Sequence, residues 1–282
     1  MTLRRRSLDW LLNAYAGLAL VYLLIPIAVI IVFSFNDPRG RFNFIWQEFS
    51  FDAWKHPFAV QGVGDALETS LKIAALSTLI ATALGTLTAL ALVRYEFKGR
   101  GPVNFFIFIP LATPEVVLGA ALLSQFLNWG TPRLGFATIL IAHVMFNLSF
   151  VVITVRSRLI GFDRSLEEAA QDLGATPWET FRLVTLPLIM PGVVSAALLA
   201  FALSIDDFVI TNFNSGSTIT FPLFIWGAAR VAIPPQIYVI ATMIFLFTVA
   251  MMIITVWQQR RAEKMAAVRV DQPEPAVQPV PA

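Results

Sequence analysis

The sequence contains no cysteine and little charge. Its 282 residues have a cysteine count of 0, so disulfide bonds, thiolate metal sites and thiol catalysis are excluded within this chain. An ordinary soluble domain is about 25% charged, whereas this chain is 13% charged, 57% hydrophobic and has a mean hydropathy of +0.73. These figures exclude a soluble enzyme, a nucleic-acid-binding module and a disordered regulator.

A phosphate-binding loop is also missing. A chain that hydrolyses ATP by the usual route needs the pattern G-x-x-x-x-G-K-[ST]. No lysine of this sequence follows a glycine; the lysines are Lys55, Lys72, Lys98 and Lys264. We therefore predict that the chain is not an enzyme and has no cofactor of its own. Any ATP and Mg²⁺ that it depends on would be bound by another chain.

Six long apolar stretches are present instead. A membrane-spanning helix uses about 20 apolar residues, and backbone polar groups in lipid must be satisfied within the segment, which favours helices. The sequence thus predicts an all-α, polytopic membrane protein with six transmembrane helices. The expected spans are Leu11–Phe35, Ile73–Val93, Val103–Trp129, Phe136–Val155, a fifth from near Leu188 to Asp206, and Ile237–Trp257.

The positions of the basic residues predict the orientation. Of the 20 Lys and Arg, fourteen fall on one side of these spans, in the N-terminus, the second and fourth loops and the tail. Because Lys and Arg concentrate in cytoplasmic segments, both termini are expected to be cytoplasmic.

The ends of the chain complete the expected organisation. A cleaved signal peptide has a shorter apolar core and a small-residue cleavage site, so the first span is expected to be retained. Residues 1–10 are then a cytoplasmic N-terminus and residues 11–260 form the six-span transmembrane domain, which contains the loop over residues 156–187. The four prolines of Asp271–Ala282 indicate a disordered tail, which we extend to residues 261–282.

The loop over residues 156–187 has well-defined local chemistry. Ser165 and Glu168 have the spacing of a capping box, and so have Thr176 and Glu179. Gly174 can end the first short helix in a left-handed conformation. We expect two short helices, with Pro187 marking the junction with the fifth span.

The first of these helices carries an apolar stripe. Leu166, Ala169, Ala170 and Leu173 follow the helical spacing. Helices this short need packing for stability. From the residues alone, the stripe either docks into a groove of another protein or packs under the chain's own helices.

The loop resembles the EAA loop of ABC-importer permeases. The matching residues are Glu168-Ala169-Ala170, Gly174 after three more residues, Val184, and Leu186-Pro187. The resemblance implies the fold of a type I ABC importer permease, whose loop holds a coupling helix seated in an ATPase subunit. Glu168, Ala169, Ala170, Gly174 and Pro187 are then the expected ATPase-coupling residues.

Other stretches resemble the spermidine/putrescine branch of these permeases. They are Ser34-Phe35-Asn36, residues 94–99, residues 157–163 and residues 204–208. The resemblance implies a substrate path containing Trp54, Glu115, Ser204, Asp206 and Asp207, although related permeases often carry aspartate at the position of Glu115. It also implies two ABC ATPase subunits, a second permease, an extracytoplasmic substrate-binding protein and a bacterial inner-membrane location.

Three acids within spans point to a cationic cargo. Glu115 interrupts the third span after Pro110 and Pro114, which should break the helix there; Asp206 and Asp207 end the fifth. An acid at a helix centre costs about 2.5–3.5 kcal/mol, so such residues are functional candidates. Neighbouring helical residues point about 100° apart, so the two aspartates cannot both face one cavity. Helix capping or pairing with another subunit is the alternative role for them.

Other polar and aromatic residues have simpler readings. His143 and Asn147 lie one turn apart in the fourth span and are expected to form interhelical hydrogen bonds rather than a metal site. Without the resemblance, Trp54 is best read as an interfacial anchor.

Three alternatives stay open at this level. The cargo of an ABC permease could be another small solute, because the coupling loop carries no information about cargo. The chain could also be a gradient-driven secondary transporter that uses the three acids as a cation relay, or a membrane scaffold that transports nothing.

Overall fold

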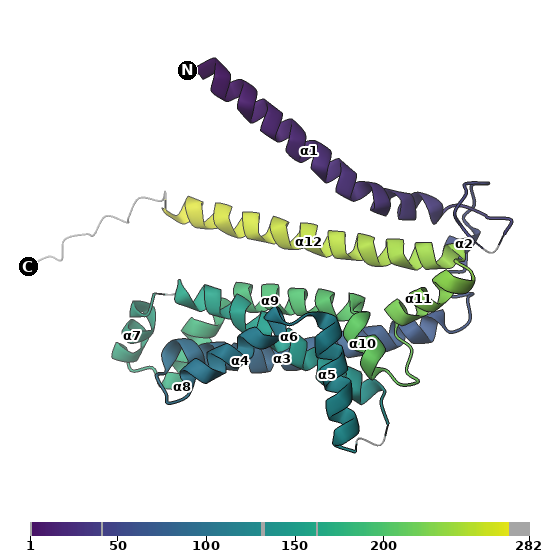
Figure 1. The fold of residues 1–282 in the computed structure, drawn as a ribbon. Coiled ribbons are helices and arrows are strands. Elements are labelled where there is room, and N and C mark those ends of the chain that lie inside the picture. The colour runs from purple at the N-terminus through teal and green to yellow at the C-terminus, as the bar shows by residue number, and fades with distance from the viewer. Residues whose placement is uncertain (1, 41, 131–132, 162, 271–282) are drawn as a thin grey trace, which may run out of the picture. The chain divides into compact units, whose positions relative to one another are not determined.

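The computed structural model describes residues 2–40, 42–130, 133–161 and 163–270. These residues are mostly helical, and none of them forms a β-strand (Figure 1). Contacts divide the chain into two compact units. The first combines Met1–Val60 with Ala232–Ala282, and the second is Gln61–Val231.

The first unit contains a helix from each end of the chain and a connecting segment. Its helices are α1 (Thr2–Phe33), α2 (Asp52–Lys55) and α12 (Pro235–Val270). The connection after α1 is organised by Asn36, which is buried. Asn36 Nδ2 donates to Asn43 Oδ1 at 2.6 Å, and Asn36 Oδ1 accepts from the backbone N–H of Gln47 at 2.7 Å. The side-chain amide of Asn36 therefore supplies hydrogen bonds to this segment, which has no helix or strand of its own before α2.

The second unit is built on three packed helices. These are α3 (Val63–Arg94), α6 (Phe136–Ile160) and α9 (Leu186–Asp206). Small residues allow close approach, as is usual between membrane helices; Ala81, Ala196 and Ala200 are fully buried in their shared core. At Gly85 the approach is closest, since a Cβ there would lie 2.5 Å from Cγ1 of Val151.

The third expected span is broken, as its prolines predict. Helix α4 (Arg100–Ala112) and helix α5 (Glu115–Asn128) meet at an angle of 113°. Thr113, between them, is extended with ψ 130°, because a residue before proline is driven out of the helical region. Within the described residues, five helices are long and apolar enough to span a membrane, and the broken pair makes six. The prediction of an all-α, six-span protein is confirmed.

The fifth span is longer than expected, and the prediction that Pro187 marks its junction with the loop is wrong. Helix α8 (Pro177–Thr180), the π-helical turn η1 (Phe181–Thr185) and α9 form one continuous span. A proline in a helix removes one hydrogen bond and crowds the carbonyl four residues earlier, here Leu183. Leu183 lies in the π turn, where the wider i→i+5 bonding absorbs that defect.

The two expected capping boxes have different outcomes. Thr176 Oγ1 accepts from the backbone N–H of Glu179, and Glu179 Oε2 accepts from the N–H of Thr176 at 2.8 Å, so the second box is confirmed. The first is wrong, because α7 (Ser165–Asp172) begins at Ser165 with no side-chain cap. The N–H of Ser165 donates to Asp163 Oδ1 at 3.0 Å instead, which holds the pKa of that carboxyl below its usual range.

Three further features concern the chain after the fifth span. Helices α10 (Val209–Asn214) and α11 (Phe221–Val231) follow the fifth span and precede α12. Helix α12 continues to Val270, ten residues beyond the expected end of the permease domain. The expected disordered segment Asp271–Ala282 lies outside the described residues.

The contact at Gly85 gives a stability prediction. We expect Gly85→Ala to destabilise the protein by about 1–3 kcal/mol, because the added methyl overpacks the α3–α6 contact. Thermal unfolding of the purified protein in detergent measures this change. Gly227→Ala is the matched control, since Gly227 lies within α11 and nothing lies within 4 Å of a Cβ built there. Equal melting temperatures for the two variants would contradict the close packing.

Candidate functional site

The end of the fifth span is a helix break capped by Asp207. The backbone of Asp207 is extended at φ −63° and ψ 118°, and it separates α9 from α10. Its carboxylate accepts from the backbone N–H of Thr211 at 2.8 Å, from Thr211 Oγ1 at 2.8 Å and from the N–H of Ile210 at 3.3 Å. These are the free amides at the start of α10, which a carboxylate stabilises. Asp207 therefore acts as the N-terminal cap of α10.

His143 joins this cap from α6. Its Nε2 lies 3.2 Å from Asp207 Oδ2 and 2.9 Å from Thr211 Oγ1, and its Nδ1 lies 2.7 Å from Ser204 Oγ. The hydroxyls of Ser204 and Ser77 are 3.0 Å apart, which adds α3. We call Ser77, His143, Ser204, Asp207 and Thr211 the polar cluster. It ties together four helices of the second unit.

The polar cluster is closed to solvent. The side chains of His143 and Asp207 are 3% and 6% exposed. An ionised carboxylate only accepts hydrogen bonds, so the shared hydrogen belongs to Nε2 of His143. The interhelical hydrogen bonds expected of His143 are confirmed. Those expected of Asn147 are not found, since neither its Nδ2 nor its Oδ1 has a partner among the described residues.

Asp206 lies in different surroundings from its neighbour. It is exposed, and its carboxylate makes no hydrogen bond or ion pair with another described residue. The two adjacent aspartates thus differ. The carboxylate of Asp207 accepts hydrogen bonds at the start of α10 and contacts His143, whereas that of Asp206 has no partner among the described residues. Helix capping, the alternative raised for both residues, applies to Asp207.

Glu115 and Trp54 lie outside the polar cluster. Glu115 is exposed in the first turn of α5, where a negative charge complements the helix dipole. Helix α5 packs on α10, since a Cβ at Gly119 would lie 2.8 Å from the ring of Phe213. Trp54 belongs to the first unit, where its Nε1 donates to Ser34 Oγ at 3.2 Å and its ring stacks on another aromatic ring. The structure thus groups Ser204 with Asp207 and leaves Trp54 in a separate unit.

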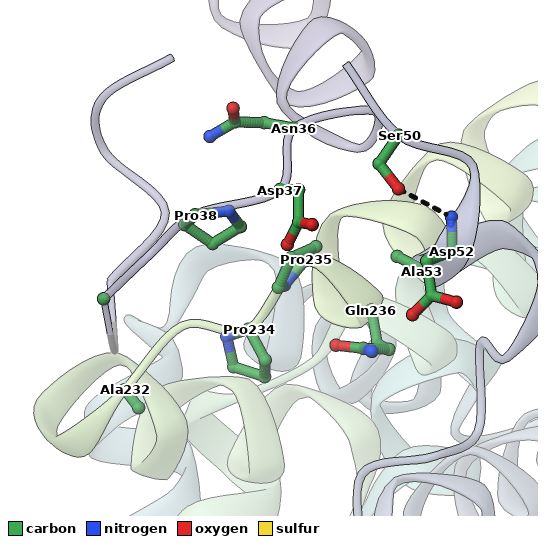
Figure 2. A pocket seen from close by; sticks show the side chains of 11 residues that line it. Asn36, Asp37, Pro38, Ser50, Asp52, Ala53, Ala232, Pro234, Pro235 and Gln236 are labelled. Atoms are coloured by element: carbon green, nitrogen blue, oxygen red, sulfur yellow. Dashed lines mark hydrogen bonds between the residues drawn. The ribbon is translucent and has the colours of Figure 1, made fainter. Parts of the chain in front are cut away.

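A small cavity of the first unit also carries negative charge. Its volume is about 280 Å³, and its lining includes Asn36, Asp37, Asp52 and Gln236. Figure 2 shows the side chains that line this cavity, among them Asp37 and Asp52. No Lys, Arg or His is among the described residues that line it.

The loop over residues 156–187 is anchored by an ion pair that the sequence did not predict. Arg94, at the end of α3, pairs with Glu167 of α7, and Thr185 Oγ1 donates to the same carboxylate. Arg164 adds a hydrogen bond to the carbonyl of Val93 at 3.1 Å. The sequence predicted no partner for Arg94. The partners lie 73 residues apart, so no local spacing could have paired them.

The apolar stripe of α7 is not covered by this anchor. Leu166 is 48% exposed and Leu173 is 90% exposed. Glu168, Ala169, Gly174 and Pro187 are also exposed, and Ala170 is half-buried. Gly174 has φ +89°, a left-handed conformation that favours glycine. Packing of the stripe under the chain's own helices is therefore excluded for the described residues.

Comparison with known proteins identifies the family. Residues 81–264 match the model of the binding-protein-dependent transport system inner membrane component. The chain belongs to this family. The match covers α6, α9 and the second half of α3, the polar cluster apart from Ser77, and the loop that contains α7.

Relatives and solved structures agree with this assignment. The spermidine/putrescine transport system permease protein PotC of Haemophilus influenzae is 37% identical over 247 residues, which is 87% of this chain and 95% of the relative. The putrescine transport system permease protein PotI of Escherichia coli is 38% identical over 80% of this chain and 83% of its own length. A bacterial ABC transporter for the acidic polysaccharide alginate has a chain with a TM-score of 0.66 at 18% identity, covering 93% of this chain and 98% of that one. At that identity the structural likeness supports the fold alone.

The anchor of α7 gives a prediction about the family's loop. We expect Arg94→Ala to weaken the attachment of α7 by about 1.5–3 kcal/mol, because it removes hydrogen bonds to a charged, largely buried carboxylate. Hydrogen exchange of residues 165–172 measures this as faster exchange. The control is Arg100→Ala, whose partner Glu96 is 95% exposed at 4.0 Å. Similar exchange in both variants would argue against the anchor.

Proposed function

We propose that this chain is the permease subunit of an ATP-driven importer of small cationic solutes, with polyamines as the substrate class. The observation that carries the proposal is the identity of 37% to a spermidine/putrescine permease over 87% of the chain. The match covers 247 residues, far more than the loop over residues 156–187. The family's loop is common to many cargoes, whereas likeness throughout the spans includes the residues that meet the solute.

The free carboxylate at the end of α9 supports a cationic cargo. Asp206 is exposed and unpaired, and a path lined by acidic groups attracts positive charge and repels anions. Polyamines also have methylene stems, which suit the apolar helices around it. Glu115, Ser204, Asp207 and Trp54 complete the proposed path, with Ser204 and Asp207 acting through the polar cluster.

The loop around α7 supports coupling to separate ATPases. Its stripe of exposed apolar side chains is held in a fixed orientation by the Arg94–Glu167 pair, and a short helix needs a partner to cover such a face. We infer that two ABC ATPase subunits, with ATP and Mg²⁺, act on the assembly and that one of them receives α7. Glu168, Ala169, Ala170, Gly174 and Pro187 then line or shape that contact.

The remaining partners follow from the same proposal. A second, related permease would complete the translocation path, and an extracytoplasmic binding protein would deliver the solute. One solved relative in fold is the bacterial alginate ABC transporter in complex with an oligosaccharide-bound periplasmic protein. The bias of Lys and Arg supports cytoplasmic termini in a bacterial inner membrane.

Reconstitution tests the proposed function. We expect proteoliposomes containing the permeases and ATPases to take up spermidine or putrescine only with ATP and binding protein, since this chain has no ATPase site. Uptake should survive ionophores that collapse ion gradients. Gradient-driven uptake by this chain alone would favour a secondary transporter, and stimulation of the ATPase by unrelated solutes would reassign the cargo.

A charge on the α7 stripe tests the coupling contact. We expect Leu173→Glu to weaken ATPase binding by about tenfold or more, because it buries an unpaired carboxylate in the docked interface. Co-purification and ATPase titration measure this. Gln171→Glu is the matched control, because it adds the same charge on the opposite face of the same helix. Equal binding by both variants would argue against docking through this stripe.

A further inference from the structure

The polar cluster contains a buried group that the proposed transport path does not use directly. His143 is 3% exposed, and both of its ring nitrogens are engaged. It lies on α6, whereas the aspartates lie at the junction of α9 and α10. Any effect of His143 on the transported solute is therefore indirect, and its role follows from the residues that its ring contacts.

His143 supplies the one side-chain donor to Asp207 from outside the α9–α10 segment among the described residues. The other donors to Asp207 are Ile210 and Thr211 of α10 itself. Those local bonds fix the start of α10 relative to Asp207. They do not fix either of them relative to the α3–α6–α9 core. The 3.2 Å contact between His143 Nε2 and Asp207 Oδ2 ties the start of α10 to α6. The far end of α10 is tied separately, since Thr138 Oγ1 of α6 donates to the carbonyl of Asn214 at 2.7 Å.

The second ring nitrogen strengthens the same connection. Nδ1 of His143 meets Ser204 Oγ at 2.7 Å, one turn before the helix break. Ser204 Oγ meets Ser77 Oγ, which also donates to the carbonyl of Ala74 at 3.2 Å. Hydroxyls both donate and accept, so this chain can satisfy Nδ1 in either protonation state. The imidazole thus contacts Ser204 in the last turn of α9 and Asp207 at the break itself.

We propose that His143 is a positioning residue that locks the α9–α10 junction, so that Asp207 stays in the polar cluster and Asp206 alone meets the substrate cation. This inference rests on the proposed function and assigns different roles to two adjacent acids. Asp206 supplies the free negative charge. Asp207 caps α10 and anchors the break. His143 touches neither the cargo nor Asp206, and it acts by fixing the backbone that carries Asp206.

Hydrogen exchange tests the positioning without any substrate. In the assembled complex, we expect His143→Ala to speed exchange of residues 207–211 by about tenfold, because the start of α10 loses its polar tether to α6, whereas Thr138 still holds its far end at Asn214. His143→Gln keeps a donor and an acceptor and should restore slow exchange. Asn147→Ala is the matched control, because Asn147 is equally buried one turn along α6 and has no described partner. Unchanged exchange in His143→Ala would overturn the inference.

Uptake of spermidine tests the route of action. We expect Asp206→Asn and His143→Ala each to slow uptake by about tenfold or more, as expected for the loss of a charge-assisted contact. The double variant should be no slower than Asp206→Asn alone, because His143 acts through Asp206. His143→Gln should recover uptake in the native Asp206 background.

The outcomes separate the two proposals. If the two substitutions multiply in the double variant, His143 has a merely structural role and the inference is overturned. If Asp206→Asn transports normally, Asp206 is not the cation contact, which also overturns it. If the unaltered complex takes up no polyamine, the proposed function fails, and the exchange measurement still decides whether His143 positions the junction.

Discussion

The interaction on which the second unit depends is the buried contact between His143 and Asp207. A carboxylate removed from water is costly unless hydrogen bonds compensate it. Here the compensation comes from two backbone amides, a hydroxyl and an imidazole. Because these donors come from α10 and α6, satisfying one acid fixes the helix break relative to the core.

Broken helices recur in this chain wherever a polar group has to be exposed within an apolar span. The break between α4 and α5 brings Glu115 to a helix start, and the break between α9 and α10 leaves Asp206 free. Irregular backbone at membrane depth is tolerated only where protein or water satisfies it. Proline supplies the first break, whereas the polar cluster supplies the second.

The architecture was largely predictable because its signals are local. Span length and apolar composition gave six spans, Pro114 gave the break in the third, and Thr176 with Glu179 gave a cap. The predictions that were wrong came from local sequence patterns whose effect neighbouring residues changed. Ser165 lost its capping role to Asp163, and Pro187 was absorbed by a π turn. In the candidate site, helical spacing predicted that Asp206 and Asp207 face different ways, but not that Asp207 caps α10 and contacts His143.

The sequence by itself determined the class of protein, the spans and the loop motif that resembles ABC-importer permeases, since composition and short-range spacing encode all of these. Only the tertiary structure decided which polar residues meet. Glu167 pairs with Arg94, and His143 with Asp207, across 73 and 64 positions of the chain. The physical reason is that a charge in an apolar interior takes whichever donor the packing of helices brings near. That choice depends on helix contacts distant in sequence, and no periodicity along the chain records it.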